Sequence, residues 1–144
     1  AGFQGVKRRM EILASHEDYV IYDDFAHHPT EIFKTLSSLR EKIGNDQIIA
    51  VIEPRSRTMQ SGLHDKEMAK ALSPADSVIW YEGQDVKRSM SAELKKAKAE
   101  VYFAANISEI IQITRQIKTT KSNIVIMSNG DFSGLRELIK KELD

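Results

Sequence analysis

The chain has 144 residues, of which 21 are Lys or Arg and 21 are Asp or Glu, so its formal charges balance at neutral pH. Without a net field to attract nucleic acid or anionic lipid, we expect neither as a partner. The chain has no cysteine, which excludes disulfides and thiolate chemistry and is typical of a reducing, cytoplasmic compartment. No apolar run approaches the length of a membrane span.

Hydrophobic periodicity predicts strands and helices in alternation along the chain. The predicted strands cover residues 9–13, 19–22, 47–52, 77–81, 101–103 and 123–127. The predicted helices cover residues 32–43, 63–72, 92–98, 108–118 and 135–143. The first two strands are close enough to form a hairpin. The later strands are continuous apolar runs, as expected of strands that are covered on both faces.

Strands that alternate with helices of this length favour right-handed crossover units. We therefore predict an α/β fold with a Rossmann-like, doubly wound and mainly parallel sheet, and with a short N-terminal hairpin or antiparallel edge strand. Leu135, Leu138 and Ile139 are expected to form the buried face of the last helix. The Lys-rich segment 92–98 is expected to be a solvated helix face rather than a binding patch.

A cluster of acids and imidazoles follows the second predicted strand. Its members are Asp23, Asp24, His27 and His28. They precede a helix that Pro29 opens, which is where open α/β sheets place ligands. A carboxylate there can accept hydrogen bonds from sugar hydroxyls, and an imidazole can donate one or lie against a flat base. A turn or capping role stays open as an alternative, whereas a metal site lacks both cysteine and a second cluster at helical spacing.

Two further polar loops, 53–62 and 128–134, also follow predicted strands. If the strands are parallel, all three loops lie at one edge of the sheet. The loop 128–134 precedes a helix, where backbone amides and the helix dipole favour an anion. An ordinary turn with an Asp or Ser cap explains the same residues equally well.

Several common motifs are missing. The chain has no Gly-x-x-x-x-Gly-Lys-Ser/Thr loop, which would hold a triphosphate for transfer. It also lacks Gly-x-Gly-x-x-Gly and Gly-x-Ser-x-Gly, which argues against a dehydrogenase and against a hydrolase with a nucleophile elbow. We therefore expect no catalytic residue in this chain alone.

Segments 5–11 (Gly-Val-Lys-Arg-Arg-Met-Glu) and 22–31 (Tyr-Asp-Asp-Phe-Ala-His-His-Pro-Thr-Glu) resemble the C-terminal domain of the Mur ligases. These are the ATP-dependent, amide-forming enzymes of peptidoglycan assembly, and the resemblance runs over essentially the whole chain. It implies that residues 1–144 form one domain of a longer protein, and that the N-terminal UDP-sugar domain and the central ATPase domain are absent from this sequence.

The resemblance also implies roles for single residues. Asp24 matches the aspartate that holds the ATP ribose, His27 the histidine beside the nucleotide, and Arg9 the arginine that reaches the phosphates from the domain junction. The planar donors of an arginine suit phosphate, whereas a surface salt bridge from Arg9 would contribute only about 0–1 kcal/mol. Mg²⁺ and the lysine that stabilise phosphoryl transfer would come from the central domain.

Segments 53–59 and 127–132 narrow the resemblance within the family. They are similar to the branch that joins recycled L-alanyl-γ-D-glutamyl-meso-diaminopimelate to UDP-N-acetylmuramate. Arg57 departs from this pattern, because a small polar residue is expected there. The implied contacts of the incoming peptide are Arg55, Ser56, Ser128 and Asn129. The alternatives are the same domain of the ligase that adds L-alanine to UDP-N-acetylmuramate, and a stand-alone nucleotide- or anion-binding module without catalysis.

Overall fold

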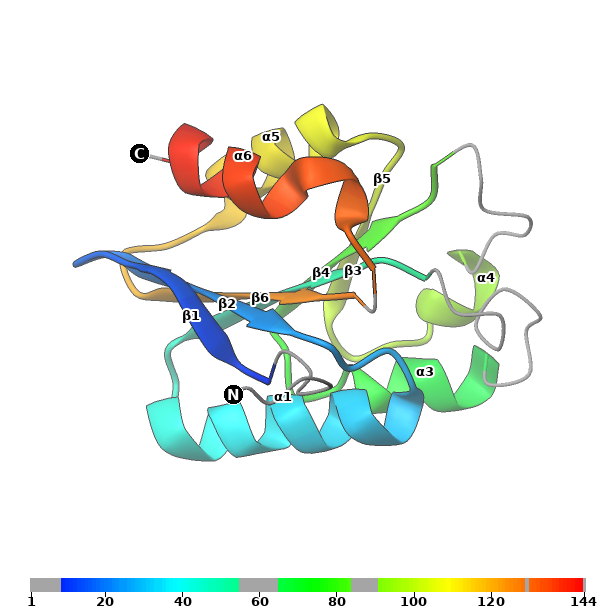
Figure 1. Cartoon of the computed structure of the whole chain (residues 1–144). Coiled ribbons are helices and arrows are strands. Elements are labelled where there is room, and N and C mark those ends of the chain that lie inside the picture. The colour runs from blue at the N-terminus through cyan, green and yellow to red at the C-terminus, as the bar shows by residue number, and fades with distance from the viewer. Residues whose placement is uncertain (1–8, 55–64, 84–90, 129, 144) are drawn as a thin grey trace, which may run out of the picture.

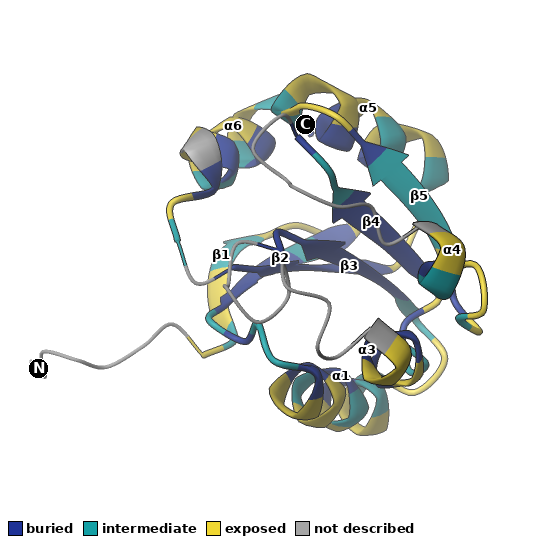
Figure 2. Cartoon of the chain, turned by 90° about the vertical axis from the view of Figure 1, so that its right-hand side faces the viewer, coloured by how far each residue is buried: buried dark blue, intermediate teal, exposed yellow. Residues whose placement is uncertain are grey.

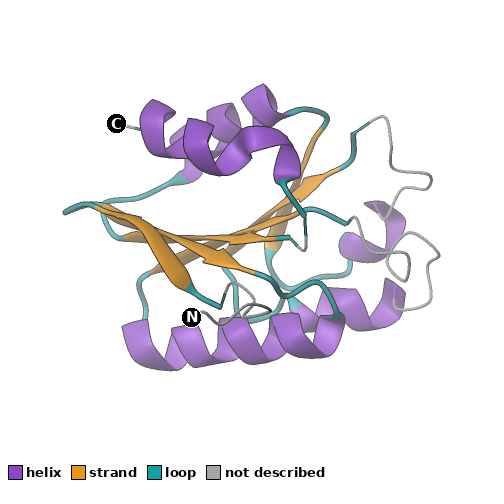
Figure 3. Cartoon of the chain, in the orientation of Figure 1, coloured by secondary structure: helices purple, strands orange, loops and turns teal. Residues whose placement is uncertain are grey.

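The computed structural model of the chain describes residues 9–54, 65–83, 91–128 and 130–143 (Figure 1). Its strands are β1 (Glu11–Ser15), β2 (Tyr19–Asp24), β3 (Gln47–Ile52), β4 (Ser77–Tyr81), β5 (Glu100–Ala104) and β6 (Ser122–Met127). Its helices are α1 (Pro29–Ile43), α3 (Asp65–Ala71), α4 (Ser91–Leu94), α5 (Ile107–Ile117), the 3₁₀ helix η1 (Phe132–Gly134) and α6 (Leu135–Glu142). Strands and helices alternate as predicted (Figure 3). None of the helices in these ranges is long and apolar enough to cross a membrane.

The described strands form one sheet in the order β1-β2-β6-β3-β4-β5. β1 pairs with β2 antiparallel, and every other pair of neighbours is parallel. The predicted α/β fold, with its mainly parallel sheet and N-terminal hairpin, is therefore confirmed. β6 lies between β2 and β3, and its last residue, Met127, is level with both Asp24 and Ile52. The carboxyl ends of these three strands consequently lie side by side.

Helices cover both faces of the sheet. α1 and α3 lie on one face, and α5 and α6 lie on the other (Figure 1). Successive side chains of a strand point to opposite faces, so β6 contributes Val125 to the α1 side and Ile124 and Ile126 to the α6 side. All of β6 is buried as a result. Figure 2 shows the central strands β3 and β4 in the dark blue of buried residues. Burial on both faces explains why the strand sequences are continuously apolar.

Residues at the two ends of α1 determine where this helix begins and ends, and it begins directly after the acidic cluster. Pro29 is the first helical residue, a position where its missing N–H costs no intrahelical hydrogen bond. Gly44 ends the helix with a φ of 69°, a left-handed conformation that favours glycine. Its N–H donates to the Arg40 carbonyl at 3.0 Å, which satisfies one of the free carbonyls at the helix end.

Most predicted boundaries differ from the structure by a few residues, as the first strand does at 11–15 instead of 9–13, and two differences matter most. β2 continues to Asp24, so the two aspartates end the strand instead of lying in the loop after it. α4 ends at Leu94 and does not reach residue 98. Leu94, its last residue, is fully buried. The chain turns after it, with Lys96 N and Ala97 N each donating to the carbonyl three residues back.

The buried face of α6 is narrower than predicted. Leu135 and Ile139 are fully buried and Leu143 nearly so, whereas Leu138 is 39% exposed. The three buried residues recur every four positions and form the stripe that packs against the sheet. Leu138 lies off this stripe, so the prediction that it belongs to the core was wrong.

Two leucines provide a matched test of this packing. Leu36→Ala removes a fully buried side chain of α1 and should lower the free energy of unfolding by about 2–5 kcal/mol. Leu138→Ala removes a side chain at the surface of α6 and should lower it by less than about 1 kcal/mol. Urea denaturation of the 144-residue chain measures both changes. Equal losses in the two variants would contradict the assigned faces.

Candidate functional site

Hydrogen bonds join the carboxyl ends of β2, β6 and β3. Ser128 N donates to the Asp24 carbonyl at 3.1 Å, and Glu53 N donates to the Met127 carbonyl at 3.1 Å. The Ser128 hydroxyl donates to Oε1 of Glu53. The prediction that the three polar loops lie at one edge of the sheet is therefore confirmed for the residues where each loop begins. Because β6 enters between two earlier strands, the strand order reverses here, which is the usual ligand position in open α/β sheets.

The two aspartates at the end of β2 point to opposite faces of the sheet, as neighbours in a strand do. Asp23 is buried on the α6 side, where Oδ1 accepts a hydrogen bond from Arg136 Nε at 2.8 Å. Asp24 lies on the α1 side, beside Lys34 and Thr35 of that helix. The adjacent acids therefore belong to separate environments, and only Asp24 borders a hollow next to α1.

Asp24 is 4% exposed and is held by two backbone donors. Ala26 N donates to Oδ1 at 2.8 Å, and Met10 N donates to Oδ2 at 3.0 Å. Burial raises the pKa of this carboxyl above its usual value, against the opposing effects of both N–H groups and of the Arg9 charge. Asp24 thus has the turn-forming role that the sequence left open, and each oxygen keeps a further lone pair for a ligand.

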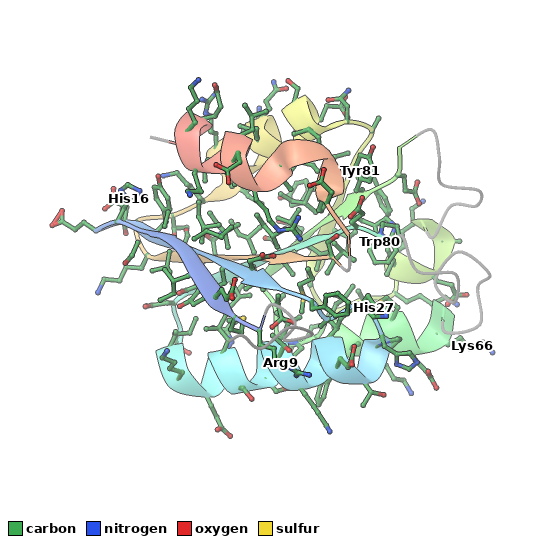
Figure 4. The ribbon with its side chains drawn as sticks, in the orientation of Figure 1. Arg9, His16, His27, Lys66, Trp80 and Tyr81 are labelled. Atoms are coloured by element: carbon green, nitrogen blue, oxygen red, sulfur yellow. The ribbon has the colours of Figure 1, made fainter. Side chains whose placement is uncertain are left out.

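Two adjoining hollows open beside Asp24, with volumes of about 360 and 260 Å³. The residues that line both are Arg9, Asp24, Lys34 and Thr35. The larger hollow extends along α1 to Lys42, and the smaller one reaches Phe25. Arg9, which Figure 4 labels beside α1, and Asp24 are therefore brought together. An acid acceptor between cationic side chains suits a ligand that carries both hydroxyl and anionic groups.

His27 is half-buried in the segment between β2 and α1 (Figure 4). Its Nδ1 lies 3.2 Å from the Phe25 carbonyl, and its ring meets the Phe25 ring edge-on, with centroids 5.5 Å apart. If Nδ1 donates to this carbonyl, Nε2 is the nitrogen left to accept. His27 lines neither of the two hollows. His28 is the N-cap of α1, but its side chain makes no capping bond.

Ser128 and Glu53 form a buried polar link between β6 and β3. Besides donating to Glu53, the Ser128 hydroxyl accepts a hydrogen bond from Gly130 N at 3.0 Å. Glu53 is 2% exposed. It was not predicted as a site residue, although an acid that directly follows a buried apolar strand and precedes Pro54 is a usable signal.

The other predicted peptide contacts, Arg55, Ser56 and Asn129, lie outside the described residues. Within the described ranges, no group of three His, Asp or Glu residues has the arrangement to hold a metal ion. Arg136 was not predicted either, because its partner Asp23 is 113 positions away in the sequence. No local pattern could have indicated that pair.

These features define a class: a Rossmann-like α/β domain whose polar edge carries an acid-lined hollow on one face and a buried Arg–Asp pair on the other. The comparison with protein families is specific. A family model described as "Mur ligase, glutamate ligase domain" matches residues 8–130. The chain therefore belongs to the Mur ligase family.

Two relatives and one solved structure place the match more closely. The UDP-N-acetylmuramate–L-alanyl-γ-D-glutamyl-meso-2,6-diaminoheptandioate ligase of Haemophilus influenzae is 34% identical over 98% of this chain and 31% of its own length. The structure of a murein peptide ligase from Psychrobacter arcticus matches this chain with a TM-score of 0.85. The two sequences are 33% identical, and the match covers 98% of this chain and 31% of the chain of that ligase. The UDP-N-acetylmuramate–L-alanine ligase of Streptococcus agalactiae is 50% identical in a match that covers 90% of this chain and 30% of that protein. The chain thus spans about a third of the length of the curated relatives it matches.

A double-mutant cycle tests the link between β6 and β3. Ser128→Ala, Glu53→Gln and the double variant are compared with the unaltered chain by urea denaturation. A hydrogen bond to a charged group contributes about 1.5–3 kcal/mol, so we expect a coupling energy of about 1–3 kcal/mol between the two changes. Strictly additive losses would show that the two side chains do not interact.

Proposed function

We propose that this chain is the C-terminal domain of an ATP-dependent ligase that joins L-alanyl-γ-D-glutamyl-meso-diaminopimelate to UDP-N-acetylmuramate in the bacterial cytoplasm. The supporting observation is the match to two peptide ligases over 98% of the chain. The relatives are about three times as long, so the remaining domains would bind the UDP-sugar and the triphosphate. In such a ligase the sugar carboxylate takes the terminal phosphoryl group of ATP, which gives an acyl phosphate and ADP. The amine of the peptide then attacks the acyl carbon, and inorganic phosphate leaves as the amide bond forms.

The hollows beside Asp24 support nucleotide binding on the α1 side. The free lone pairs of the Asp24 carboxylate suit two adjacent ribose hydroxyls, and the Arg9 guanidinium at the rim suits phosphate. His27 is proposed to lie against the base. The described residues offer no cluster for Mg²⁺, so the central domain of the ligase is proposed to hold it. Closure of the two domains would complete the site.

The peptide is proposed to bind at the β3 and β6 ends, where the loops 53–62 and 128–134 begin. The tripeptide differs from alanine by extra carboxylates and an ammonium group, so its site needs additional charged and polar partners. Arg55 can take a carboxylate with two parallel hydrogen bonds, and Ser56 and Asn129 are the further proposed contacts. Ser128 is fully buried with its hydroxyl on Glu53, so its proposed part is to order the loop.

A second candidate is the domain of a UDP-N-acetylmuramate–L-alanine ligase. The observation that favours it is the 50% identity to the Streptococcus agalactiae enzyme. That match covers 90% of the chain, against 98% for the peptide ligases. The loop sequences 53–59 and 127–132, which resemble the peptide ligases, also favour the first candidate. A stand-alone binding module remains the third, and it requires that no phosphate loop is encoded upstream.

Substrate preference tests the proposal. The full-length protein is assayed for ADP release and product mass with UDP-N-acetylmuramate, ATP and Mg²⁺, and with either the tripeptide or L-alanine as the amine. We expect kcat/KM for the tripeptide to exceed that for L-alanine by about a hundredfold or more, because unfilled polar subsites penalise the smaller amine. Preference for L-alanine would favour the second candidate, and no ligation with either would reject both. The 144-residue chain alone should hydrolyse no ATP, because it lacks a phosphate loop.

Asp24→Asn tests the nucleotide half of the site. The amide keeps the size of the side chain but loses one acceptor and the negative charge. Loss of a hydrogen bond to a charged group costs about 1.5–3 kcal/mol, so the KM for ATP in the full-length enzyme should rise about ten- to a hundredfold. Asp18→Asn, in the exposed turn between β1 and β2, is the matched control and should change nothing. An unaltered ATP KM in Asp24→Asn would remove this residue from the nucleotide site.

A further inference from the structure

Arg136 links the end of β2 to the loop 128–134. Its Nε donates to Asp23 Oδ1 at 2.8 Å, and its Nη1 donates to the Asp131 carbonyl at 2.8 Å. The Arg136 side chain is 12% exposed and that of Asp23 is buried. A guanidinium holds its donors in one rigid plane, so this single side chain fixes the distance from the strand end to the loop.

The loop segment that Arg136 holds has an unusual backbone. Phe132, directly after Asp131, has a φ of 55°, a left-handed conformation that is rare for a bulky residue. Such a conformation persists only where surrounding contacts impose it. Two contacts do so here: the Phe132 ring is fully buried against Tyr81, with centroids 5.4 Å apart, and Arg136 binds the preceding carbonyl. Gly134, with a φ of 78°, then turns the chain into α6.

The first part of the same loop is held from the other side. Ser128 donates to Glu53, the residue directly after β3, and Gly130 N donates to the Ser128 hydroxyl. The loop is therefore attached to β3 at its start and to β2, through Arg136 and Asp23, near its end.

Stability alone does not account for an arginine at position 136. Among the described residues its buried Nη2 has no hydrogen-bond partner, and an unpaired buried donor is unfavourable. Replacing a buried ion pair by apolar side chains is often neutral or stabilising. The two bonds that the guanidinium does make share one property, which is that they set the geometry of the loop.

We propose that Asp23 and Arg136 are positioning residues that hold residues 130–134 in the shape that receives the incoming peptide. This inference rests on the proposed function. Neither residue lines the hollows beside Asp24, so the pair acts on the amine substrate and leaves nucleotide binding unaffected. Asp23 and Asp24 thereby serve the two substrates separately, from opposite faces of one strand.

Steady-state kinetics of the full-length ligase test the pair. Arg136→Lys keeps a positive charge for Asp23, but one ammonium group cannot reproduce the planar fork that also reaches the Asp131 carbonyl. Arg136→Met and Asp23→Asn remove the ion pair itself. In all three variants we expect the KM for the tripeptide to rise about ten- to a hundredfold, because small misplacements of a binding group have effects of that size. The KM for ATP should stay within about twofold, since uniform binding of only one substrate is lost.

Arg115→Met is the matched control. Arg115 of α5 also binds α6, because its Nε donates to the Glu142 carbonyl at 3.0 Å, but it does so at the far end of that helix from the loop. If Arg136 merely docks α6, Arg115→Met should raise the tripeptide KM as much as Arg136→Lys does. That result would overturn the proposal, as would an unchanged tripeptide KM in Arg136→Lys or an equal rise in both KM values.

The substrate preference of the unaltered enzyme distinguishes a failure of this inference from a failure of the proposed function. If it ligates L-alanine and not the tripeptide, the proposed substrate is wrong, and the KM of L-alanine replaces that of the tripeptide in the same comparison. A selective rise in the KM of the amine substrate then still supports positioning by Arg136, and its absence rejects it.

Discussion

β6 lies between β2 and β3, and the polar edge of the sheet depends on this placement. A parallel sheet brings the carboxyl ends of its strands to one edge, but it does not decide which ends are neighbours. The entry of β6 between two earlier strands lets Ser128 form hydrogen bonds with both neighbours, to Asp24 through the main chain and to Glu53 through the side chains. Residues from three distant parts of the sequence thereby share one surface.

The charged residues at this edge of the sheet lie in two different environments, one on each face. On the α1 side, Asp24 and Arg9 border open hollows, and burial raises the pKa of the acid. On the α6 side, Asp23 and Arg136 neutralise each other away from water. An acid that borders a hollow is available to a ligand, whereas a buried pair mainly fixes geometry. The sheet itself keeps these two environments apart, which allows neighbouring acids to have different roles.

The fold was largely predictable because continuous apolar strands and alternating elements are local signals. Asp24 was predictable for the same reason, since it stands in a conspicuous cluster directly after a strand. Glu53 also follows a buried strand directly, which is a usable local signal, but its contact with Ser128 spans 75 positions and could not be predicted. Arg136 has no such signal, and its partner is 113 positions away. The exposure of Leu138 depends on which stripe of α6 meets the sheet, and the periodicity of a helix of only 8 residues defines that stripe poorly.

The opposite orientations of Asp23 and Asp24 impose a constraint on insertions and deletions. Side chains alternate along β2, so gaining or losing one residue within the strand would turn every later side chain to the other face. The carboxylate now paired with Arg136 would then face the hollow, and its neighbour would be driven into the α6 side, with the composition of the chain almost unchanged. The length of β2 is therefore constrained by electrostatics as well as by packing, whereas the loops after it can change length without exchanging the two acids.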